Sequence, residues 1–191
     1  MDRLGRLFGS LARVKLLRLF VFNQGTSFTL ADAARRSSLD GTVVRRELAA
    51  LREAGVVAKR GDRALAKYQA NARYEHLAAL EAFIRDTTIL RPEYILAALR
   101  KAGTLRVVAL SGLFTGAVET RVDLLVAGDN LDLRAIAKAV RTLEAELGRE
   151  IRYAVFETPE FRYRLGVYDR LLRDVFDYPH RLLVDRIGLT P

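Results

Sequence analysis

The strongest constraint on the fold is the order of apolar patterns in the first 75 residues. Apolar residues recur at helical spacing after the cap residue Ser10, again after the cap Thr29, and a third time from Thr42 to the stop signal Gly55. A valine-rich strand, a charged turn and a second strand then follow. The predicted helices span 11–22, 30–36 and 42–54, the strands 56–58 and 65–69, and the turn 59–63.

Three short helices followed by a basic hairpin are the order of a winged helix-turn-helix. If the apolar residues of the third helix face the core, its opposite face holds Thr42, Arg45, Arg46 and Ala49. The candidate DNA contacts on this helix are Thr42, Val43, Arg45 and Arg46. A recognition helix uses its N-terminal residues in the major groove, where arginine binds guanine bidentately. The plainer alternative is an ordinary solvated helix face, but the surrounding architecture favours DNA contact.

The hairpin carries further candidate DNA contacts. Basic side chains on a wing reach phosphates or the minor groove, and they position the protein more than they select a sequence. A charged hairpin tip kept for solubility is the alternative for each single residue. The candidates are Lys59, Arg60, Arg63 and Lys67.

Positive charge is concentrated in the same part of the chain. Residues 1–76 hold 15 Lys and Arg against 7 Asp and Glu. This region therefore accounts for nearly all of the net charge of +9 that the whole chain carries. Such an asymmetry is typical of a module that binds phosphates. We therefore expect double-stranded DNA as a partner of this region.

The segments 12–17, 43–48 and 51–57 resemble the winged helix-turn-helix regulators of the ArsR-like group, over roughly residues 8–75. The resemblance implies transcriptional regulation. The chain has no cysteine, so the thiol metal-sensing property of some members is not carried over. We expect no metal and no cofactor.

The second half follows a different pattern. Helical segments at 74–85 and 92–101 fall largely within a predicted connector, 76–103. From Thr104 strands alternate with helices: strands at 105–110, 122–127 and 151–156, a helix at 133–147, helical structure around 159–176, and a strand or helix at 181–187. The prediction is an α+β protein with an N-terminal domain at 1–75 and a small α/β domain at 104–191.

The C-terminal half resembles a minimal nucleotidyltransferase domain, which carries a Gly-Ser turn and then two aspartates flanking one residue. Segments 111–116 and 121–126 stand at those places, but the Gly-Ser order is inverted and Arg121 replaces the first aspartate. Because two-metal catalysis needs several carboxylates, we expect an inactive domain. Asp123 is then either a leftover catalytic ligand or a structural residue that pairs with Arg121 or caps a turn. A candidate nucleotide site remains, with a loop that cradles phosphate: Ser111, Gly112, Gly116, Arg121 and Asp123.

The first functional hypothesis is a non-enzymatic, DNA-binding transcriptional regulator whose C-terminal domain serves sensing, homodimerisation, or binding of a nucleotide or protein. The alternatives are an active nucleotidyltransferase directed to its substrate by the winged domain, and a pure protein-interaction module. The sequence has neither a long apolar span nor a secretory signal, which predicts a cytoplasmic protein without membrane contact.

Overall fold

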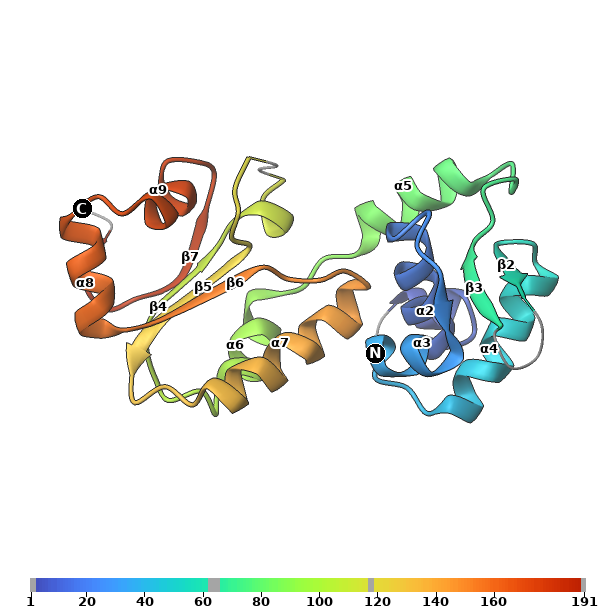
Figure 1. The fold of residues 1–191 in the computed structure, drawn as a ribbon, viewed down its shortest axis with the longest axis horizontal. Helices are drawn as coiled ribbons and strands as arrows, with labels where there is room; N and C mark the ends of the chain where they lie inside the picture. The colour runs from blue at the N-terminus through green and yellow to red at the C-terminus, as the bar shows by residue number, and fades with distance from the viewer. Residues whose placement is uncertain (1–2, 62–65, 117–118, 190–191) are drawn as a thin grey trace. The chain divides into compact units, whose positions relative to one another are not determined.

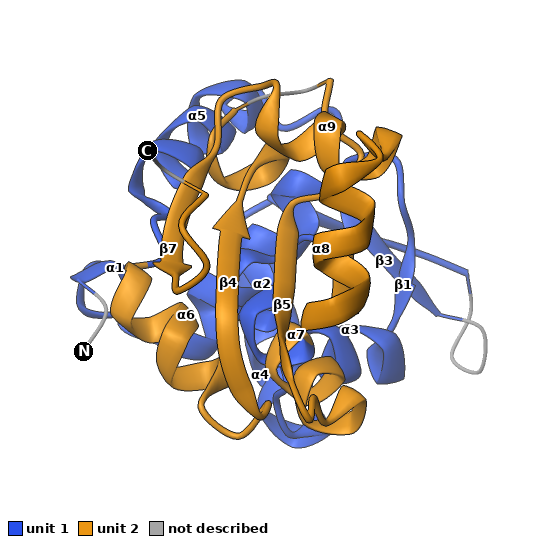
Figure 2. Cartoon of the chain, turned by 90° about the vertical axis from the view of Figure 1, so that its left-hand side faces the viewer, with its two compact units in different colours: residues 1–90, 141–150 blue, residues 91–140, 151–191 orange. Residues whose placement is uncertain are grey.

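The computed structural model describes residues 3–61, 66–116 and 119–189, and the chain is a mixed α+β protein with two compact units. Figure 1 shows the order of the elements and Figure 2 the two units. Unit 1 comprises residues 1–90 and 141–150, and unit 2 comprises 91–140 and 151–191. The predicted connector 76–103 is thus divided between the units, and a segment from the second half of the chain belongs to unit 1.

Unit 1 begins as the apolar spacing predicts. Ser10 caps α2 by accepting a hydrogen bond from the Arg13 amide, and Thr29 and Asp32 form a reciprocal capping box at the start of α3. The third helix begins one residue earlier than predicted, because Asp40 caps it. The helices are α1 (Arg3–Leu7), which was not predicted, α2 (Leu11–Phe22), α3 (Leu30–Ser37), α4 (Gly41–Glu53) and α5 (Leu77–Thr87).

A three-stranded antiparallel sheet completes this part of unit 1. Its strands are β1 (Phe28–Thr29), β2 (Val57–Arg60) and β3 (Lys67–Ala70), in the order β1-β3-β2. Lys59 and Arg60 were predicted in the turn but lie in β2, because backbone pairing with β3 continues to the Arg60–Lys67 pair. The core joins α2, α3, α4 and the sheet, with Phe20, Val44 and Leu48 almost completely buried.

Residues 141–150 form an integral part of unit 1. The buried Arg18 of α2 donates to Thr88 Oγ1 and to the Glu146 carbonyl, both at 3.0 Å. Lys15 forms an ion pair with Glu146 at 2.8 Å, and the Asn23 side chain donates to the Gly148 carbonyl at 2.7 Å. Arg18 interrupts an apolar run in the sequence, and these distant partners explain why an arginine is tolerated there.

Unit 2 is built around a four-stranded sheet in the order β6-β5-β4-β7, in which only the β5–β6 pair is parallel. Val107, Leu125 and Phe161 belong to the cluster on the face covered by α8 and α9, whereas α6 lies on the opposite face (Figure 1). Alternate residues of buried strands point to opposite faces, so both faces are apolar. The elements are α6 (Pro92–Leu99), β4 (Thr104–Leu110), the 3-10 turn η1 (Gly112–Phe114), β5 (Leu124–Asp129), α7 (Leu133–Leu147), β6 (Tyr153–Glu157), α8 (Thr158–Gly166), α9 (Arg170–Phe176) and β7 (Arg181–Asp185).

Several predicted boundaries in unit 2 differ from the structure: for example, the strand predicted at 151–156 is β6, Tyr153–Glu157. The strand predicted at 122–127 begins at Leu124, because Asp123 turns its carboxylate into a hydrogen-bonded cluster. The helical stretch predicted around 159–176 is broken into α8 and α9 where Tyr168 adopts a positive φ of 53°. Among the described residues no helix is long and apolar enough to cross a membrane.

Candidate functional site

The exposed face of α4 begins at the first turn of the helix. Asp40 accepts a hydrogen bond from the Thr42 amide at 2.8 Å, which fixes where the helix starts and holds the pKa of that carboxyl below its ordinary value. Val44, Leu48 and Leu51 are buried as predicted. The remaining predicted residues divide by exposure: Thr42, Arg45, Arg46 and also Ala49 are exposed, and Val43 is half-buried.

A buried carboxylate lies directly behind this face. Glu47 is only 2% exposed, yet its carboxylate accepts hydrogen bonds from Ser10 Oγ at 3.1 Å, from Arg13 Nε at 3.0 Å and from Arg46 Nη2 at 3.0 Å. Burial alone would raise the pKa of Glu47, but the hydrogen bonds from Arg46 and Ser10 and the charge of Arg13 outweigh it and lower the pKa. Glu47 therefore stays ionised and ties α4 to the first turn of α2.

The two arginines of the exposed face consequently differ. The Arg46 guanidinium is anchored on Glu47 although its side chain is 72% exposed. Within the part of the chain that the structure describes, the Arg45 side chain has no hydrogen bond or ion pair. Arg46 thus has a fixed partner, whereas Arg45 has none among the described residues.

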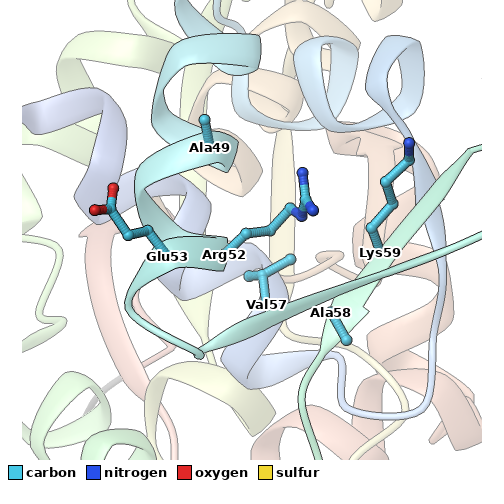
Figure 3. A pocket seen from close by; sticks show the side chains of 6 residues that line it. All are labelled: Ala49, Arg52, Glu53, Val57, Ala58 and Lys59. Carbon is cyan, nitrogen blue, oxygen red and sulfur yellow. The ribbon is translucent and has the colours of Figure 1, made fainter.

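An open hollow of about 450 Å³ lies between the end of α4 and strand β2 (Figure 3). Ala49 and Val57 line it together with the cationic side chains of Arg52 and Lys59. Figure 3 shows the Glu53 carboxylate extending away from these two cations. Neither Arg52 nor Lys59 pairs with an acid in the described ranges 3–61, 66–116 and 119–189. The lining of the hollow therefore holds the two cations Arg52 and Lys59 and one carboxylate, Glu53, that pairs with neither of them among the described residues.

The hairpin adds basic residues at paired positions. Arg60 lies directly opposite Lys67 across β2 and β3, and Lys59 lies opposite Tyr68. All three basic side chains are exposed. The fourth predicted wing residue, Arg63, lies outside the described residues. The structure thus brings Lys59 to the hollow beside α4 and places Arg60 and Lys67 together on the hairpin.

The candidate nucleotide site at Ser111, Gly112, Gly116, Arg121 and Asp123 differs in its hydrogen bonds from the phosphate-binding loop that the sequence predicts. The amide groups proposed to cradle a phosphate are already engaged: Leu113 donates to Asp123 Oδ1 at 2.8 Å, and the amides of 114–116 donate to carbonyls of the same turn. The Ser111 side chain donates to the Val122 carbonyl, and Gly112 has a positive φ of 48° beside the Asp123 carboxylate. Gly116 also has a positive φ, and nothing outside its chain neighbours lies within 4 Å of where a β-carbon would be.

Asp123 pairs with Arg152 and not with Arg121, so the alternative of an Arg121 pair was wrong, whereas the hydrogen bond that Asp123 accepts from the Leu113 amide agrees with the alternative of a turn cap. Arg152 Nε and Nη2 donate to the two carboxylate oxygens at 3.0 and 2.8 Å, and its amide donates at 2.9 Å. Burial of Asp123 would raise its pKa, but these hydrogen bonds and the one from Leu113 lower it. Arg121 forms its ion pair with Asp174 of α9 instead, with 3.7 Å between Nε and Oδ2.

Three residues of these sites were missed by sequence reasoning. Glu47 was assigned no role, Arg52 was not included in the interface, and Arg152 was not connected to Asp123. Only Arg52 carries a local signal, since it follows Arg45 by seven residues on the same helix. The described residues contain no cluster of three or more acidic, histidine or cysteine side chains that could hold a metal ion.

No protein-family model, curated protein or solved structure matches the chain.

Proposed function

We propose that the protein is a transcriptional regulator that binds duplex DNA through α4 and the β2–β3 hairpin of a winged helix-turn-helix. The observation that carries the proposal is the exposed row of Thr42, Arg45 and Arg46, continued by the cationic hollow at Arg52 and Lys59. The order α2-β1-α3-α4-β2-β3 supports it, since α4 then takes the position of a recognition helix.

The hairpin supports an anionic partner independently. Like charges directly opposite each other destabilise an antiparallel pair, and Arg60 faces Lys67 in this way. A DNA phosphate between or beside them would neutralise that repulsion. The same residues offer no comparable advantage if the hairpin contacts an apolar protein surface.

For unit 2 we propose a non-catalytic role in sensing, dimerisation or partner binding. Both Asp123 oxygens accept hydrogen bonds from Arg152, so neither is available as a metal ligand without breaking a buried ion pair. This argument weighs against the nucleotidyltransferase alternative.

The proposal is tested by titrating a fluorescent duplex with the full chain at several salt concentrations. If Arg52, Lys59, Arg60 and Lys67 each neutralise a phosphate, the plot of log affinity against log salt should have a slope of about −3 to −4. The charge variant Arg52→Ala should reduce the magnitude of the slope by about 0.9. Arg134→Ala, an exposed arginine of α7 in unit 2, is the matched control and should leave it unchanged.

A slope near zero, or equal effects of Arg52→Ala and Arg134→Ala, would place the interaction elsewhere. The full chain is the appropriate sample, because residues 141–150 complete unit 1.

Substitutions on α4 should change the preference among DNA sequences, whereas substitutions on the hairpin should change the affinity for all sequences. Arg46→Ala is expected to cost about 1–3 kcal/mol on a preferred site and to flatten the preference among sequences, since base contacts specify. Lys59→Ala should weaken all sequences alike, since phosphate contacts position. Binding of a preferred and a scrambled duplex by both variants measures the difference. If Lys59→Ala abolished the preference and Arg46→Ala preserved it, α4 would not be the recognition helix.

A further inference from the structure

We infer that Glu47 is a positioning residue that sets the sequence preference of the proposed DNA interface by holding the Arg46 guanidinium for guanine. The inference rests on the proposed function and deepens it. It assigns a specificity role to a buried acid that does not itself reach DNA.

The contacts of Glu47 place Arg46 in one orientation. Arg46 Nε and Nη2 both donate to Glu47 Oε1, at 3.3 and 3.0 Å. The other oxygen, Oε2, accepts from Arg13 Nε at 3.0 Å, and Ser10 Oγ donates to Oε1. Because Arg13 and Ser10 belong to the beginning of α2, the carboxylate is fixed to a second element of unit 1 and cannot follow Arg46 if that side chain moves.

The remaining donors of Arg46 suit a base edge. A guanidinium has five N–H donors, and the side-on contact with Glu47 uses Nε–H and one N–H of Nη2. The end-on edge, with one N–H from each Nη atom, has no partner among the residues that the structure describes. That edge has the geometry for bidentate donation to guanine N7 and O6, whereas adenine presents a donor at the second position. The chemistry therefore points to guanine.

Arg45 provides the internal comparison. It has the same side chain on the same exposed face, but it has no partner among the described residues. An arginine that is free in the unbound protein loses rotamer freedom on binding, whereas a pre-oriented fork loses less. We therefore assign Arg46 to base recognition and Arg45 to sequence-independent attraction.

The test begins with selection from a random duplex library by the wild-type full chain, which yields a preferred site. The measured quantity is the ratio of affinities for this site and for a site with its selected guanines replaced by adenine. Glu47→Gln is expected to lower that ratio about tenfold, within the range for one bidentate base contact, because the neutral amide no longer fixes Arg46. Affinity for the replaced site should change less than about twofold.

Two further variants separate positioning from general loosening. Arg13→Gln removes the hydrogen bond to Oε2 and leaves Arg46 on Oε1, so the ratio should be preserved. Adding Glu47→Gln to Arg46→Ala should cause no further loss, because Glu47 acts through Arg46. Arg46→Lys keeps the charge but lacks the fork, and it should lose the preference while keeping the salt slope. This exposed variant does not depend on the fold tolerating a change at Glu47.

The inference is overturned if Glu47→Gln in folded protein keeps the wild-type ratio. It is also overturned if Arg46→Lys keeps that ratio, if Arg13→Gln flattens the preference equally, or if the double variant loses more than Arg46→Ala alone. Failure of the proposed function has a different signature, because the wild-type chain would then select no site and bind no duplex.

Discussion

Replacing Gly148 by alanine is expected to lower the free energy of unfolding of unit 1 by about 3 kcal/mol or more. Gly148 has a positive φ of 71°, and an added β-carbon would lie 2.5 to 2.7 Å from atoms of Arg18 and Leu19, most of them backbone. Neither the conformation nor the space suits a side chain. Because its carbonyl also accepts the Asn23 hydrogen bond, a displaced Gly148 would detach residues 141–150 from α2.

Gly25→Ala is the matched control for this substitution. Gly25 has a φ of 83°, but nothing lies within 4 Å of an added β-carbon, so only the conformational cost of about 1 kcal/mol should appear. Hydrogen exchange resolved to the peptides of α2 measures both variants without assuming that the two units unfold together. Equal protection of α2 in the two variants would mean that residues 141–150 contribute little to unit 1.

Asp123→Asn is expected to destabilise unit 2 by about 3 kcal/mol, at the lower end for a broken buried ion pair, since Arg152 is half exposed and can be hydrated. The new amide would present a donor to the Leu113 and Arg152 donors that now meet a carboxylate. Urea unfolding followed by hydrogen exchange in β4 and β5 measures the loss. Asp177→Asn, whose pair with Arg173 lies on the surface, should change it little.

The pH dependence gives this prediction a second measurement. The folded state lowers the pKa of Asp123, so its stabilisation is fully present above about pH 4 and is lost as the pH falls through the folded pKa. Asp123→Asn should therefore reduce the acid sensitivity of unit 2. Transfer of labelled nucleotide in the presence of Mg²⁺ that disappears in this variant, while unit 2 stays folded, would instead favour the nucleotidyltransferase alternative.

Much of the secondary structure could be predicted because its signals are local. Ser10 and Thr29 cap helices through hydrogen bonds that reach only three residues along the chain, and the spacing of Val44, Leu48 and Leu51 fixes which face of α4 is buried. The end of β2 could not be predicted from local signals, because the continuation of this strand to Arg60 depends on pairing with β3. A charged pattern alone favours a turn at that position.

The parts that could not be predicted depend on distant partners. The buried state of Glu47 requires Ser10 and Arg13, more than thirty positions earlier, and Asp123 finds Arg152 across the β5–β6 pair and not the adjacent Arg121. Local spacing cannot indicate which of several arginines an acid meets. For the same reason the sequence could not distinguish Arg46 from Arg45, and the proposed role of Arg46 depends on its contact with Glu47 in the structure.

The discontinuous make-up of unit 1 has a consequence for the order in which a growing chain acquires its folded parts. Arg18 emerges from the ribosome early, but the Glu146 carbonyl that it binds is 128 residues later. At about 5–20 residues per second, α2 waits for about 6–26 seconds before its last partners are synthesised. Thr88 follows Arg18 by 70 residues and is made first, whereas the Glu146 carbonyl is missing until the end of the interval. The surface around Phe22 likewise awaits the guanidinium of Arg149 that covers it in the finished protein. Completion of unit 1 is therefore delayed until residues 91–140, the first part of unit 2, have been made.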